Sequence, residues 1–263
     1  MRLLALVLAC AGLGCASRPA AAAALRHPGC FILHDLDRGT QVRVHPAACG
    51  RATVPASTFK IPHALIALQT RVITDPMAEV AWDGTPQWNE AWERPHSLAT
   101  AIRDSVVWFF QRTAVAIGRE RMQSFLEALD YGNAEASGEL TTFWLDDGAL
   151  RITGDEQLDF LLRMFRRELP IDRAHVDTVE RLMLSDEQVL APRLPPGEKL
   201  PVTDAKIHAK TGTGRGVSWW VGRVTGPRGD FVFVSRVTTT GEPARKSPAL
   251  TAGLRALVQA RAL

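Results

Sequence analysis

The sequence predicts an α+β fold with two lobes, an antiparallel β-sheet flanked by helices and an all-helical region inserted between its strands. Two strand-like runs joined by a turn come early, over residues 31–45, and three more follow from Lys206. The residues between these two groups have the apolar spacing of helices, and the chain ends in another helical stretch. Strands grouped on either side of a long helical segment are typical of an antiparallel sheet with a helical lobe beside it.

The first elements follow from local residue patterns. Residues 31–45 place β-branched and apolar residues around a turn that contains Gly39, which predicts a hairpin. Residues 58–73 carry apolar side chains at helical spacing. Pro62 is tolerated only in the first turn of a helix, so this helix should begin close to Ser57. Ser57 would then lie at a helix N-terminus, where backbone N–H groups favour negative charge.

The later elements are predicted in the same way. Apolar periodicity predicts two helices within residues 97–129, one over 154–168, one over 172–184 and one from Pro248 to Leu263. From Lys206 the pattern changes. Ile207 and Ala209 alternate into Lys210, and two strand-like runs, residues 217–224 and 231–237, flank a turn over 225–230, which predicts a β-meander.

Composition indicates a globular chain and argues against two kinds of partner. Of the 263 residues, 46% are hydrophobic and 22% are charged, as in ordinary globular proteins. Removing Arg2 and Arg18 with a cleaved leader would leave 29 basic residues against 28 acidic ones, a net charge of +1. This balance argues against binding to nucleic acid or to an anionic membrane surface.

The N-terminus has the features of a secretory signal peptide. Arg2 precedes a short apolar run, and small residues permit cleavage near Ala22–Ala24. We therefore expect residues 1–24 to be a leader and the protein to be exported. Cys15 could instead carry a lipid anchor, although the residues before it fit such a signal poorly. No other segment has about 18 uninterrupted apolar residues, so no stable membrane insertion is expected.

Two cysteines remain after the leader, Cys30 and Cys49. An even pair in an exported protein is typical of a disulfide. The two residues flank the predicted hairpin, so a bridge across its ends is geometrically reasonable. The alternative is a pair of free, buried cysteines.

The chain contains a serine and a lysine three residues apart, Ser57 and Lys60, at the start of an apolar segment. On a helix these positions share a face. A lysine in an apolar wall loses its proton easily and can act as a base for a serine nucleophile. The pattern alone is weak, because it occurs by chance about once in a chain of this size. The alternative is a helix-capping serine followed by a solvated lysine.

A second candidate motif, Lys210-Thr211-Gly212, lies at the end of a strand-like run. A cation there can hold a substrate carboxylate, and the small residues leave room for a ligand along the strand edge. In isolation, a surface lysine before a turn remains a credible alternative.

Three further residues gain meaning only in combination. Ser105 could relay a proton to a leaving nitrogen, but alone it is an ordinary helix serine. Tyr131 precedes Gly132, which is typical of a helix end. Trp144 is more often a core residue, although its indole N–H could steady an anion.

The order of these motifs resembles the class D (oxacillinase-type) serine β-lactamases, from about Cys30 to the C-terminus. Pro55–Pro62 and Trp219–Gly222 are nearly unmodified from the family pattern. The resemblance implies one catalytic domain over residues 25–263 with the fold shared by serine β-lactamases and penicillin-binding transpeptidases. It also implies a periplasmic hydrolase that opens β-lactam rings, penicillins and oxacillin-type substrates among them, and confers antibiotic resistance.

The resemblance assigns roles to individual residues. Ser57 would be the acylated nucleophile, and Lys60 would be N-carboxylated and act as the base in acylation and deacylation. Val107 and Trp144 would form the pocket of this carbamate. Ser105 would pass a proton to the lactam nitrogen. The substrate carboxylate would be held by Lys210, Thr211, Gly212 and Arg245, and the oxyanion by the backbone N–H groups of Ser57 and Thr213.

The chain departs from many family members in the short link Thr213–Ser218 before Trp219. Arg215 in this link could offer a second carboxylate contact, or could be a solvated turn residue. The link affects the outer rim of the pocket, so the substrate spectrum beyond penicillins stays open.

The resemblance implies a small-molecule β-lactam as partner, and no cofactor or metal apart from carbon dioxide or bicarbonate as the source of the carbamate. No paired-histidine zinc pattern occurs among the seven histidines. Monomer and homodimer both remain open. Two rival functions share most motifs: a penicillin-binding transpeptidase or carboxypeptidase, and the β-lactam-sensing domain of a receptor. Tyr131, Trp144 and the compact size argue against the first, and the lack of a multi-helix membrane segment argues against the second.

Overall fold

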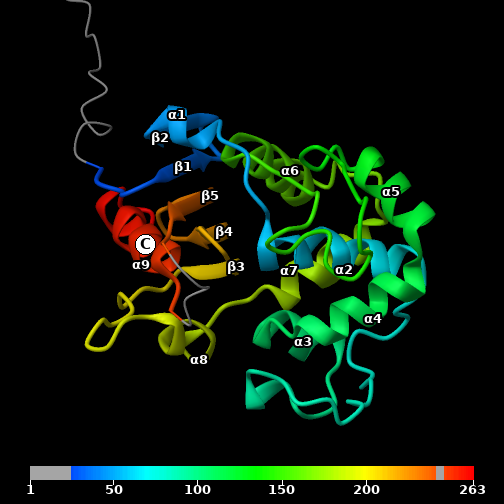
Figure 1. Cartoon of the computed structure of the whole chain (residues 1–263). Coiled ribbons are helices and arrows are strands. Elements are labelled where there is room, and N and C mark those ends of the chain that lie inside the picture. The colour runs from blue at the N-terminus through cyan, green and yellow to red at the C-terminus, as the bar shows by residue number, and fades with distance from the viewer. Residues whose placement is uncertain (1–24, 241–245) are drawn as a thin grey trace, which may run out of the picture.

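The computed structural model describes residues 25–240 and 246–263. Its centre is a five-stranded antiparallel sheet in the order β2-β1-β5-β4-β3 (Figure 1). The strands are β1 (Cys30–Asp35), β2 (Thr40–Val44), β3 (Lys206–Gly214), β4 (Val217–Gly226) and β5 (Gly229–Thr238). The predicted hairpin and meander are therefore confirmed, and the last strand of the hairpin in sequence, β2, lies at the edge opposite β3.

Alternation along the strands separates two apolar cores. Trp219 and Trp220 are both fully buried but point to opposite faces of β4. Trp219 packs in the larger core, between the sheet and the helical lobe. Trp220 packs against Phe233, with ring centroids 4.3 Å apart, in the core under α9 (Pro248–Gln259). Figure 1 shows α9 on this face and the helical lobe on the other side of the sheet.

The helical lobe contains the predicted helices, with two differences. Its elements are the 3-10 helices η1 (Ala56–Phe59) and η2 (Glu90–Trp92), and α2 (Lys60–Gln69), α3 (Leu98–Asp104), α4 (Val107–Ile117), α5 (Arg119–Ala128), α6 (Gly154–Arg166) and α7 (Arg173–Leu182). Three helices replace the two predicted within residues 97–129, because left-handed backbone at Ser105 and positive φ at Gly118 each end a helix. The helix predicted over residues 58–73 begins as η1 and already ends at Gln69.

A short helical segment that the sequence did not predict precedes β3. It comprises α8 (Glu187–Leu190) and the 3-10 helix η3 (Ala191–Arg193). Figure 1 shows α8 beside the edge of the sheet formed by β3. It therefore lies next to the strand that carries the Lys210 motif.

Cys30 and Cys49 form a disulfide, as predicted. The bridge joins β1 to α1 (Pro46–Cys49) and lies under the start of α6. An added Cβ at Gly154, the first residue of α6, would come within 2.7 Å of the Cys30 sulfur. The predicted leader, residues 1–24, lies outside the described residues. Over the part of the chain that the structure covers, no helix has the length and apolarity needed to cross a bilayer.

Candidate active site

The candidate site forms where the edge strand β3 packs against η1. Gly212 permits this approach, because an added Cβ would lie 2.9 Å from the carbonyl oxygen of Pro55 and 2.9 Å from the backbone nitrogen of Thr58. The η1 turn itself contains a left-handed residue, Ala56, with φ of 49°. The Ser57 turn and the Lys210 strand, far apart in sequence, are thus brought side by side.

Ser57 and Lys60 are in direct contact. Lys60 Nζ lies 2.8 Å from Ser57 Oγ, at the junction of η1 and α2. Lys60 is fully buried, and burial lowers the pKa of its ammonium to about 7. Within residues 25–240 and 246–263, no carboxylate forms a salt bridge with Lys60. Near neutral pH, a large fraction of Lys60 is therefore an uncharged amine beside the serine hydroxyl.

An aromatic cluster surrounds Lys60, and we define it as Phe59, His63, Phe110 and Trp144. Lys60 Nζ lies 5.4 Å from the centroid of the Phe110 ring. His63 contacts Phe110 and Trp144 edge-on, with centroids 5.1 and 5.5 Å apart, and Phe59 contacts both His63 and Trp144. Val107, at the start of α4, is half-buried and packs against the same core. The cluster supplies the apolar surroundings that keep Lys60 uncharged.

Trp144 contributes an unusual polar atom to this cluster. The side chain is fully buried, and its Nε1 has no hydrogen-bond partner among the described residues. Buried donors are nearly always paired, since an unpaired one costs about 1–3 kcal/mol. The N–H is therefore available to an acceptor that the unmodified side chains do not provide.

His63 is a member of the cluster that the sequence did not single out. The Thr113 hydroxyl lies 3.0 Å from the Phe110 carbonyl oxygen and 3.0 Å from His63 Nε2. His63 Nδ1 has no hydrogen-bond partner among the described residues. Burial, and then the charge of Lys60, lower the pKa of His63 to about 3. His63 is consequently a neutral wall of the pocket.

Ser105 and Lys210 form the second contact of the site. Lys210 Nζ donates to Ser105 Oγ at 2.9 Å and to the Thr211 carbonyl oxygen at 3.0 Å. Ser105 has φ of 61° at the C-terminal end of α3, and this left-handed turn presents it to β3. Burial holds the pKa of Lys210 well below its ordinary value, and the positive charges of Lys60 and Arg193 lower it further. The site thus holds two serine–lysine pairs.

The predicted site also includes Thr211, Thr213 and Arg245. Thr211 and Thr213 are half-buried in β3, opposite Trp220 and Ser218 of β4. Arg245 lies outside the described residues.

The turn arginine Arg215 is exposed. Its backbone N–H donates to Asp146 at 2.6 Å, and its side chain lies 3.6 Å from Asp147. These surface contacts favour the solvated alternative for this residue.

A serine–lysine pair at the start of a helix, facing a lysine on an edge strand, defines a class of serine acyltransferases and hydrolases. In keeping with this, residues 36–254 match the family model of the penicillin-binding protein transpeptidase domain.

Similarity to individual proteins identifies the family within this class. The chain is 35% identical over 220 residues to "Probable beta-lactamase YbxI" of Bacillus subtilis (strain 168), covering 82% of this chain and 77% of that protein. It is 38% identical over 178 residues to β-lactamase OXA-48 of Klebsiella pneumoniae, covering 66% and 62%. A crystal structure of a class D β-lactamase from Bacillus subtilis superposes with a TM-score of 0.76 at 32% identity, covering 88% and 91%. The chain belongs to the class D β-lactamase family.

Proposed function

We propose that this protein hydrolyses β-lactam antibiotics through a Ser57 acyl-enzyme, with N-carboxylated Lys60 as the general base in both acylation and deacylation. One observation carries the proposal: a buried lysine of lowered pKa lies 2.8 Å from the serine, in a cluster that holds an unpaired Trp144 N–H. Family membership supports the ring-opening reaction.

The carbamate follows from the chemistry of the pocket. An uncharged Lys60 amine can add carbon dioxide, forming an N–C bond and releasing one proton, which yields an anionic group. The carbamate would be a stronger hydrogen-bond acceptor than the amine and would act as a base at neutral pH. The indole N–H of Trp144 would donate a hydrogen bond to the carbamate, and the apolar cluster together with Val107 would exclude water from it. No cofactor or metal enters this proposal, and bicarbonate would be the only source required.

In acylation, Lys60 takes the proton of Ser57 as Ser57 Oγ attacks the lactam carbonyl. The backbone N–H groups of Ser57 and Thr213 stabilise the oxyanion. When the ring C–N bond breaks, Ser105 gives its proton to the nitrogen and regains one from Lys210. Before deacylation, Lys60 releases its proton to solvent and Lys210 is reprotonated. In deacylation, Lys60 takes a proton from the water that attacks the Ser57 ester and returns it to Ser57 Oγ as the ester bond breaks.

Substrate binding would use the edge of β3. Lys210, the Thr211 hydroxyl and Arg245 would hold the substrate carboxylate, and Gly212 lets the substrate lie close to the strand. We propose penicillins and oxacillin-type compounds as substrates, and an exported, periplasmic enzyme that confers resistance. The disulfide supports export, because such bridges persist in oxidising compartments.

One experiment separates this function from its rivals. The purified protein is incubated with a penicillin while ring opening is followed by absorbance and the adduct by intact mass. We expect catalytic ring opening with only a transient adduct on Ser57. A stable adduct without turnover would indicate a transpeptidase or a β-lactam sensor and would refute the proposal.

A further inference from the structure

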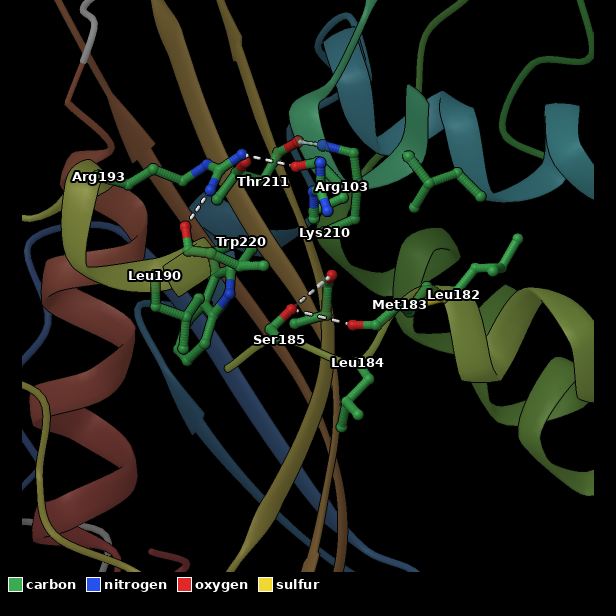
Figure 2. Close-up of a pocket in the computed structure, with 13 residues that line it drawn as sticks. Arg103, Leu182, Met183, Leu184, Ser185, Leu190, Arg193, Lys210, Thr211 and Trp220 are labelled. Carbon is green, nitrogen blue, oxygen red and sulfur yellow. Dashed lines mark hydrogen bonds between the residues drawn. The ribbon is translucent and has the colours of Figure 1, made fainter. Parts of the chain in front are cut away.

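The segment α8–η3 brings a half-buried arginine to the rear of the site. Arg193, the last residue of η3, extends from this segment toward Thr211 and the end of α3 (Figure 2). No motif pointed to Arg193, and the proposed mechanism assigns it no role. Burial lowers its pKa, and over the described residues no carboxylate forms a salt bridge with it.

The Arg193 guanidinium is bonded to two backbone carbonyls from different parts of the chain. It donates to the carbonyl oxygen of Arg103 at 2.8 Å and to that of Val189. These carbonyls lie in the last turns of α3 and α8, where helix carbonyls lack partners within their own helix. A cation is favoured at such ends. Arg193 thus joins the helical lobe to the segment that precedes β3.

The contact with α3 lies two residues from Ser105. The next carbonyl, that of Asp104, accepts a hydrogen bond from the Trp92 indole at 3.0 Å. Two consecutive carbonyls before Ser105 are therefore held by side chains from outside α3. Because Ser105 adopts a left-handed conformation that is strained for a non-glycine residue, such a turn persists only when its surroundings impose it.

The space beside Arg193 is too small for a substrate group. Arg193, Lys210, Thr211 and Ser185 line a cavity of about 10 Å³, which is at most the room for one water molecule. A carboxylate subsite at this position is therefore disfavoured.

We propose that Arg193 is a positioning residue, which fixes the Ser105 turn against Lys210 and so serves acylation. This inference rests on the proposed function.

The positive charge of Arg193 also affects proton transfer in the pair of Ser105 and Lys210. In the unmodified protein, Lys60 and Arg193 lower the pKa of Lys210 and Asp104 raises it. A carbamate on Lys60 would be an anion and would raise the pKa of Lys210, which leaves Arg193 as the group that lowers it. Asp104 itself is paired with Arg94 and Arg103. Arg193 therefore makes Lys210 a better proton donor to Ser105 when the lactam nitrogen leaves.

The test separates the two halves of the reaction. Acylation is timed with a fluorescent penicillin, and deacylation is timed from the decay of the isolated acyl-enzyme. The variants are R193A, R193Q and R193K, and the matched control is R255A, an exposed arginine of α9 that pairs with Glu198. We expect R193A to slow acylation about 10–100-fold, as a misplaced catalytic group does, with deacylation and R255A within about twofold of wild type.

Two further readouts distinguish positioning from general stability. R193K should recover part of the acylation rate, since it keeps the charge and can reach one carbonyl. R193Q should move the alkaline limit of acylation to higher pH, because Lys210 loses a positive neighbour. Should R193A not fold, R193K and R193Q provide the comparison.

Three outcomes would overturn the inference. They are unchanged acylation in the Arg193 variants, an equal loss of acylation and deacylation, and an alkaline limit that does not move in R193Q. A wild-type protein that acylates without turnover contradicts the proposed hydrolysis alone, because the acylation comparison still stands. A wild-type protein that forms no adduct refutes both.

Discussion

The Trp144 N–H, which is unpaired among the described residues, provides the sharpest test of the proposed Lys60 carbamate. Trp144→Phe keeps an aromatic ring against Phe59 and His63 but removes the indole N–H. If the carbamate forms, the substitution removes one hydrogen bond to an anion. If Lys60 works as a bare amine, the substitution removes a donor that bonds to nothing.

The size of the effect follows from these contacts. A hydrogen bond to a charged group contributes about 1.5–3 kcal/mol, and 1.4 kcal/mol corresponds to about tenfold in affinity. The bicarbonate concentration that half-restores activity should therefore rise about 10–150-fold. Stability without bicarbonate should change by no more than about 1 kcal/mol. The cavity left by the smaller ring costs stability, and relief of the unpaired buried N–H offsets that cost.

The assay titrates bicarbonate into protein stripped of carbon dioxide and measures penicillin hydrolysis. Urea unfolding in bicarbonate-free buffer gives the change in stability. Trp220→Phe is the matched control, because Trp220 is also fully buried but lies on the opposite face of the sheet, and its N–H has no partner in residues 25–240 and 246–263. Its bicarbonate requirement should stay at the wild-type value.

An unchanged half-saturating bicarbonate concentration in Trp144→Phe would refute the reasoning. So would a loss of about 3 kcal/mol or more in bicarbonate-free buffer, since the N–H would then have a partner in the unmodified protein. An equal shift in Trp220→Phe would assign the effect to core packing.

Three other predictions concern Lys60 and the disulfide. Lys60→Ala should lower turnover by about 10²–10⁴-fold, as loss of a general base does, and intact mass should reveal an accumulated Ser57 adduct; wild-type turnover would contradict the assigned role. Because the amine is protonated below its pKa of about 7, activity lost at acid pH should return at neutral pH faster with bicarbonate than without, and equal recovery would count against a carbamate. Replacing Cys30 and Cys49 by serine should lower the free energy of unfolding by about 2–4 kcal/mol and leave turnover unchanged. An unaltered urea midpoint would show that the bridge adds no stability.

Local patterns were sufficient for the parts of the fold whose geometry is local. The runs of β-branched and aromatic residues from Lys206, separated by turn residues, predicted three strands that the structure confirms, because the preference of such residues for strands is local. The pair Ser57 and Lys60 could be placed together for the same reason, since one helical turn separates them.

Contacts between segments that are distant in sequence could not be predicted from local patterns. Arg193 reaches Arg103 across 90 residues, and His63 bonds to Thr113 across 50. Arg193 bonds to a carbonyl at the end of a helix, and His63 bonds to a buried hydroxyl. Both partners lack a hydrogen bond of this kind until the chain has folded. The break at Ser105 was missed for a related reason, because serine has no strong preference for left-handed backbone and tertiary contacts impose it there.

The count of acceptors around Lys60 favours the carbamate over the bare amine. A neutral primary amine has one lone pair, and Ser57 Oγ, 2.8 Å away, is the group whose proton it must take. That lone pair cannot also accept from the Trp144 N–H, which has no partner in the part of the chain that the structure describes. A carbamate adds two oxygens, enough to accept from both Trp144 and Ser57. In the proposed mechanism the same gain would serve deacylation, since the base would then have to reach a water molecule after Ser57 has become an ester.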